Sequence, residues 1–103
     1  MLAKVKLAKR IQTSVFDQEL LDLIAAAIAD IQHAGVEFDY TVVKTNNVIL
    51  NYLVTDPLIS RAIVTYCVMN FGSPDDYDRL KASYDEQKGQ LRESSGYGLE
   101  VVG

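Results

Sequence analysis

Hydrophobic side chains recur at three- and four-residue steps over residues 17–34, which predicts a buried amphipathic helix. Its apolar stripe is expected to consist of Leu20, Leu23, Ile24, Ala27, Ile28 and Ile31. Ser14 or Asp17 is positioned to cap its start, and Gly35 would supply the left-handed residue that follows many helix C-termini. A shorter basic helix is predicted before it, at residues 2–12, with one side formed by Ala3, Leu7 and Ile11.

The hydrophobic period shortens to two residues from Val36, where apolar and polar side chains begin to alternate. This alternation predicts a half-buried strand to about Val42, because β-branched and aromatic residues favour strands. The polar residues 44–47 favour a turn, and residues 48–54 would return as the second strand of a hairpin. A short helix over residues 47–54 is the alternative, since the apolar residues there also suit one helical face.

Two helix start signals follow the predicted hairpin. Asp56 and Pro57 predict a third helix that runs through residue 70, where Phe71-Gly72 ends it. This helix is apolar on more than one side, which is typical of a central position. Ser73-Pro74 predicts the start of a fourth helix, whose buried stripe would be Tyr77, Leu80, Tyr84 and Leu91.

The predicted fold is mainly α, a small bundle of three to four helices. A β-hairpin at about residues 36–55 is inserted between the second and third helices. With 103 residues, the chain suits a single helical domain over residues 1–93, followed by an extended C-terminal tail over residues 94–103. This tail has the pattern of a flexible docking peptide, with a strand added to the hairpin as the alternative; its apolar residues are Tyr97, Leu99, Val101 and Val102.

The net charge is −4, from 14 acidic and 10 basic residues, and this disfavours a general nucleic-acid binder. Basic residues nevertheless gather at the start of the chain, at Lys4, Lys6, Lys9 and Arg10. They indicate either a solvated helix face or a contact patch for an acidic partner or DNA phosphates. The second interpretation makes a small DNA-binding regulatory protein an alternative function.

Catalytic and metal-binding patterns are missing from the sequence. The chain has one histidine, His33, and one cysteine, Cys67, which lies in the apolar third helix and is expected to be buried. Phosphate-binding loops, nucleophile elbows and zinc motifs do not occur. We therefore expect no enzyme, no cofactor and no metal. Apolar runs of membrane-spanning or signal-peptide length are also missing, which predicts a soluble, unexported protein with no membrane partner.

The predicted hairpin carries more apolar surface than one sheet face needs. If it projects from the bundle, it would contact neighbouring subunits or line a channel; otherwise it folds back onto the helices. The candidate contact residues are Phe38, Tyr40, Lys44, Asn46, Asn47, Ile49 and Tyr52.

Three stretches of the sequence resemble one family. They are DPLISRAIVTY at residues 56–66, NFG at residues 70–72 and DYDRLKASYDEQKGQLR at residues 76–92. Together with LLDLIAAA at residues 20–27, they are similar to the head-to-tail connector family of tailed bacteriophages. Members of this family are also called head-completion or DNA-packaging proteins.

This resemblance implies a structural virion protein in the neck between head and tail, present in the host cytoplasm before assembly. Such an adaptor forms a dodecameric ring beneath the portal after DNA packaging and extends the DNA channel. It then receives the stopper protein, while DNA passes through without sequence-specific binding. The resemblance places portal binding in the tail, at the four apolar residues from Tyr97 to Val102. A tail-side completion protein of the same virion is a further alternative.

Overall fold

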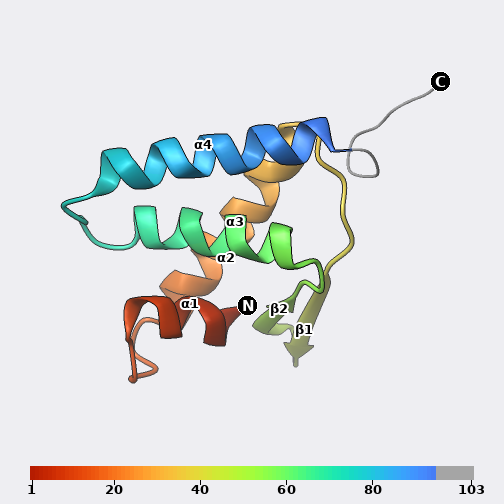
Figure 1. Cartoon of the computed structure of the whole chain (residues 1–103). Coiled ribbons are helices and arrows are strands. Elements are labelled where there is room, and N and C mark those ends of the chain that lie inside the picture. The colour runs from red at the N-terminus through yellow and green to blue at the C-terminus, as the bar shows by residue number, and fades with distance from the viewer. Residues whose placement is uncertain (95–103) are drawn as a thin grey trace.

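The computed structural model describes residues 1–94, and this part of the chain contains four helices and a two-stranded hairpin (Figure 1). In order, these are α1 (Leu2–Lys9), α2 (Asp17–His33), β1 (Thr41–Thr45), β2 (Val48–Leu53), α3 (Pro57–Asn70) and α4 (Tyr77–Glu93). The mainly helical fold with a hairpin between the second and third helices is thus confirmed. The alternative helix over residues 47–54 is excluded, because this segment pairs antiparallel with β1.

Helix α3 lies at the centre and packs against α1, α2 and α4. In Figure 1, α3 and α4 run side by side in opposite directions, α2 crosses behind them, and α1 lies beside the hairpin. The core is built mainly from α2 and α3 side chains that are fully shielded from solvent: Leu20, Ile24, Ala27, Ile31, Ile59, Ala62, Ile63 and Cys67. Each large aliphatic side chain buried in this way contributes about 1.5–3 kcal/mol. The predicted central role of the third helix is confirmed.

Helix α2 ends at the glycine that the sequence indicates. Gly35 has a φ of 95°, and its N–H donates to the Gln32 carbonyl at 3.0 Å. The next N–H, that of Val36, donates to the Ile31 carbonyl at 3.4 Å, which completes a Schellman motif. Val36 is itself fully buried. The turn therefore directs the chain back onto the core and toward the hairpin.

Helix α3 begins at the predicted cap. The Asp56 carboxylate accepts the N–H groups of Leu58 at 2.8 Å and Ile59 at 3.2 Å. Pro57 occupies the first helical position, where no N–H is needed. The start and end of this helix both match the prediction.

The predicted caps of α2 and α4 are wrong. Neither Ser14 nor Asp17 caps α2 with its side chain; the Asp17 carboxylate accepts a hydrogen bond from Lys6 Nζ at 2.7 Å instead. Helix α4 begins at Tyr77, later than Ser73-Pro74 suggests, and lacks a side-chain cap. Asp76, just before it, pairs with Arg79. In both places a carboxylate forms an ion pair instead of binding the helix terminus.

Helix α1 is shorter than predicted and buries a different side. It ends at Lys9 because Arg10 takes a left-handed conformation, with a φ of 58°. Val5 is fully buried, whereas Leu7, predicted to lie on the buried side, is 79% exposed. The backbone nitrogens of Met1 and Leu2 donate to Asn51 Oδ1 at 3.3 and 3.0 Å. This contact with β2 determines which side of α1 faces the core. The spacing of the apolar residues within α1 does not determine it.

The hairpin is shorter than predicted at its start and contains a bulge. Strand β1 begins at Thr41, so residues 36–40 form a connection and not a strand. The turn is at Asn46 and Asn47, with φ values of 52° and 65°, as in the type I′ turns that match strand twist. In the register, Val43 pairs with Asn51 and Lys44 with Ile49, so Leu50 has no partner. This extra residue changes which side chains face the core.

A polar cluster joins α2 to α4. The Tyr84 hydroxyl donates to Asp30 Oδ2 at 2.6 Å, and Lys88 Nζ donates to the same oxygen at 2.9 Å. Lys88 Nζ also lies 4.9 Å from the centre of the Tyr84 ring, and the Tyr66 ring of α3 contacts that ring edge-on. Partial burial raises the pKa of Asp30, but the hydrogen bonds from Tyr84 and Lys88 outweigh it and lower the pKa overall. The cluster therefore holds an ionised carboxylate.

Replacing Tyr84 by Phe should lower the free energy of unfolding by about 1 kcal/mol at pH 7. A hydrogen bond to a charged group is worth about 1.5–3 kcal/mol, and solvent screens this partly exposed carboxylate. Because folding lowers the pKa of Asp30, its stabilising contribution is complete above about pH 4 and is lost as the pH falls further. Urea unfolding at several pH values should show the deficit of the variant shrinking below about pH 4.

Tyr66→Phe is the matched control. It also removes one tyrosine hydroxyl, but the hydroxyl of Tyr66 forms no hydrogen bond with any residue from 1 to 94. A Tyr84→Phe deficit equal at pH 7 and pH 3 would show that the carboxylate does not stabilise the fold through this contact.

Candidate functional site

The groups that most often carry chemistry are poorly placed for it. His33 is exposed at the end of α2. Burial raises the pKa of the Cys67 thiol to about 12, so this side chain is a packing residue and not a nucleophile. Within the described residues, no group of three or more His, Cys, Asp or Glu side chains could hold a metal ion. The candidate functional sites within residues 1–94 are therefore interaction surfaces.

The basic residues at the start of the chain do not form one free patch. Lys6 is paired with Asp17, and Lys9 Nζ lies 5.8 Å from the centre of the Phe71 ring. Lys4 instead lines a hollow beside α3, and Arg10 is the residue that ends α1. Two of the four cations are thus engaged within the subunit.

The predicted contact residues of the hairpin divide into two groups. Tyr52 is only 7% exposed and belongs to the core, while Phe38 and Ile49 are half-buried against it. Tyr40 is 40% exposed, and its ring lies 6.1 Å from that of Phe38 and 6.4 Å from that of Tyr52. The remaining three residues are exposed near the turn: Lys44, Asn46 and Asn47.

Sequence reasoning missed three exposed apolar side chains on β2. Val48, Leu50 and Leu53 are 55%, 48% and 47% exposed, and we call them the outer patch. The bulge at Leu50 allows Ile49 and Tyr52, three residues apart, to face the core together. A signal was present in the sequence: Ile49 and Tyr52 are three residues apart, and a strand can turn both toward one buried face only if a bulge lies between them.

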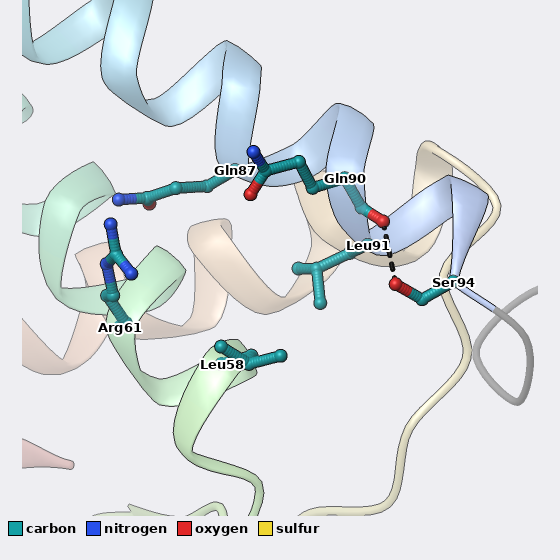
Figure 2. A pocket seen from close by; sticks show the side chains of 6 residues that line it. All are labelled: Leu58, Arg61, Gln87, Gln90, Leu91 and Ser94. Atoms are coloured by element: carbon teal, nitrogen blue, oxygen red, sulfur yellow. Dashed lines mark hydrogen bonds between the residues drawn. The ribbon is translucent and has the colours of Figure 1, made fainter.

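A hollow of about 120 Å³ lies between the start of α3 and the end of α4. Figure 2 shows Leu58 and Arg61 of α3 facing Gln87, Gln90 and Leu91 from the last turns of α4, together with Ser94, which directly follows that helix. Gln87 Oε1 is buried and has no hydrogen-bond partner within residues 1–94.

A second hollow lies on the other flank of Arg61. Its lining joins α1 to α3 through Lys4, Pro57, Ser60, Arg61, Val64 and Thr65. Among the described residues, neither Lys4 nor Arg61 forms an ion pair. Two unpaired cations therefore line one surface of α3. The predicted docking residues of the tail, Tyr97, Leu99, Val101 and Val102, lie outside the described part of the chain.

The comparisons with known proteins gave one match. A family model described as phage connector protein matches residues 1–98. No significant match was found among curated proteins or solved structures. Of the helices in residues 1–94, none combines the length and hydrophobicity needed to cross a membrane.

The two sides of the hairpin should respond differently to truncation. Tyr52→Ala should lower the free energy of unfolding by about 3 kcal/mol, because it leaves a cavity in the core. Leu50→Ala, in the outer patch, should change it by less than about 0.5 kcal/mol. Urea unfolding of the two variants measures both values. Equal losses would contradict the assignment of inner and outer sides.

Proposed function

Because the chain belongs to the phage connector protein family, we propose that it is the adaptor that joins the portal of a filled head to the rest of the neck. The observation that carries this proposal is the family match over residues 1–98. The family is structural, and the work of such a protein is to form contacts. After packaging, the subunits would assemble as a ring beneath the portal, extend the DNA channel and present a surface to the stopper protein.

The outer patch supports a contact between subunits. Three large aliphatic side chains, each about half exposed, lie together on one strand of a two-stranded sheet. Exposed apolar clusters of this kind commonly mark protein interfaces. A ring needs an interface between two unlike surfaces of the same subunit, and we assign the hairpin to one of them. Tyr40 and the exposed turn residues Lys44, Asn46 and Asn47 are further candidates for contacts with a neighbouring subunit.

The negative net charge of the chain suits a channel through which DNA passes without binding. Each subunit carries a net charge of −4, so a ring of subunits would be strongly acidic and would repel the DNA backbone. The DNA-binding alternative is weakened, because Lys6 and Lys9 are engaged with Asp17 and Phe71. DNA would pass through the ring without sequence-specific binding.

The C-terminal segment is our candidate for portal binding. Its apolar residues Tyr97, Leu99, Val101 and Val102 would be the anchors of this contact. Before assembly the subunit would be a monomer in the host cytoplasm, with residues 1–93 as its folded domain.

Deleting residues 96–103 should abolish binding to portal-bearing heads. The unfolding midpoint should stay close to that of the full chain, because the core lies within residues 1–94. Co-sedimentation with purified heads measures binding, and urea unfolding provides the control. If the shortened chain sediments with heads as the full chain does, the segment is not the portal anchor.

Leu50→Glu should prevent ring formation and leave the monomer folded, because a charge placed in an apolar interface is strongly unfavourable. Gln32→Glu, on the exposed side of α2, is the matched control with the same added charge. Native mass spectrometry of the portal-bound protein would count the copies. A full ring with Leu50→Glu would exclude the outer patch from the subunit interface.

A further inference from the structure

We propose that the outer patch of one subunit packs against an apolar corner of the next subunit, formed by Leu7, Val15 and Phe16. The corner lies where α1 ends and α2 begins, and we call it the α1–α2 corner. This pairing rests on the proposed ring and adds to it the second of the two unlike surfaces that a ring needs. Three features of the subunit support it: the exposure of the corner, its position relative to the hairpin and its charge.

The α1–α2 corner exposes large apolar side chains on an ordered part of the fold. Leu7 and Val15 are 79% and 78% exposed, and Phe16 is 39% exposed. The Phe16 ring packs edge-on against the ring of Phe71 at 5.4 Å between centres, and Phe71 packs against the core. Surface apolar residues are normally scattered singly, whereas here three lie within one short segment. Because the corner is already held in place, a partner can bind it without a large entropic cost of ordering.

The α1–α2 corner and the outer patch lie at opposite ends of α1. At its start, α1 contacts β2, where the Leu2 N–H donates to Asn51 Oδ1 at 3.0 Å. At its other end, Arg10 ends the helix and the chain enters the corner. The eight residues of α1 span about 12 Å, so the two surfaces cannot cover each other within one subunit. In Figure 1, the connection from α1 to α2 lies at the lower left and the hairpin at the lower right.

This placement suits a contact that repeats from subunit to subunit. When opposite ends of two identical subunits meet, each pair keeps one free end of each kind, so a third subunit can add in the same way. Such head-to-tail contacts close into a ring or continue as a filament, depending on the rotation between subunits. A contact between two outer patches would stop at a dimer instead. The proposed pairing therefore covers both apolar surfaces of every subunit in a closed ring.

The charges beside the two surfaces are also complementary. The corner segment, residues 7–16, contains two cations and no acid. One of these cations, Arg10, is exposed and forms no ion pair within the described part of the chain. Asp39 is exposed just before β1, whose first residue pairs with Leu53 of the outer patch, while Lys44 lies near the turn at the other end of β1. An acidic edge beside one surface and a basic edge beside the other favour contact between unlike surfaces over contact between like ones.

Cross-linking of paired cysteines with bismaleimidoethane tests the proposal. In concentrated solution, Val15→Cys with Leu50→Cys should form a ladder of dimers, trimers and larger products, because each subunit carries both sides of the contact. Native Cys67 should not react, since burial raises the pKa of its thiol to about 12. Ala82→Cys with Leu50→Cys is the matched control, because Ala82 is exposed on α4. We expect about tenfold more product from the first pair, equivalent to a preference of about 1.4 kcal/mol.

Single variants and a charge variant show which surfaces meet. Val15→Cys alone and Leu50→Cys alone should give little cross-linked product, because like surfaces do not contact each other in this arrangement. Arg10→Glu, added to the first pair, should lower the yield by about threefold, which is the effect of losing one exposed ion pair.

Four results would overturn the proposal. The first is the absence of a ladder from the first pair, and the second is an equal yield from the Ala82→Cys control. The third is abundant dimer from Leu50→Cys alone, because two hairpins would then pair with each other. The fourth is a yield that rises with Arg10→Glu, because the facing surface would then be basic. The reaction contains no portal, so its outcome is independent of the co-sedimentation experiment that tests portal binding.

Discussion

Burial of α3 against three other helices is the contact on which the rest of the molecule depends. Ile59, Ala62, Ile63 and Cys67 are fully shielded from solvent, so α3 presents buried side chains over most of its length. Its start is fixed by the Asp56 carboxylate, which accepts two backbone N–H groups. With α3 fixed, α2 and α4 are brought close enough for Tyr84 and Lys88 to reach Asp30. Leu58 and Arg61 lie on the solvent-facing side of α3, away from these buried side chains.

The surfaces that we propose for assembly arise from this same arrangement. The hairpin is held by its inner face, where Tyr52 enters the core, and by Asn51, whose side-chain oxygen accepts hydrogen bonds from the first residues of α1. These contacts leave Val48, Leu50 and Leu53 uncovered. The hairpin of the folded subunit thus presents the outer patch, while the end of α4 precedes the segment that we propose for portal binding.

Local signals in the sequence predicted much of the fold. Four of these signals depend only on the conformations of a few adjacent residues. They are the Asp56-Pro57 start of α3, its Phe71-Gly72 end, the glycine that ends α2 and the paired asparagines of the turn.

The errors in the prediction have a different origin. The rotation of α1 is set by Asn51, which is distant in sequence. Asp17 forms an ion pair where helix capping was expected, and α4 begins later than Ser73-Pro74 indicates, next to the ion pair of Asp76 with Arg79. The bulge at Leu50 depends on what the hairpin packs against. The two hollows beside Arg61 join residues from α1, α3 and α4, so the spacing within one helix does not reveal them.

The central claim is that this phage connector protein assembles directly on the portal. Electron cryomicroscopy of purified, DNA-filled heads incubated with the protein tests it most directly. Our account predicts a closed ring of added density beneath the portal, continuous with the DNA channel, into which the described helices and hairpin fit. A portal vertex without added density, or the protein bound to the tail tube instead, would contradict it.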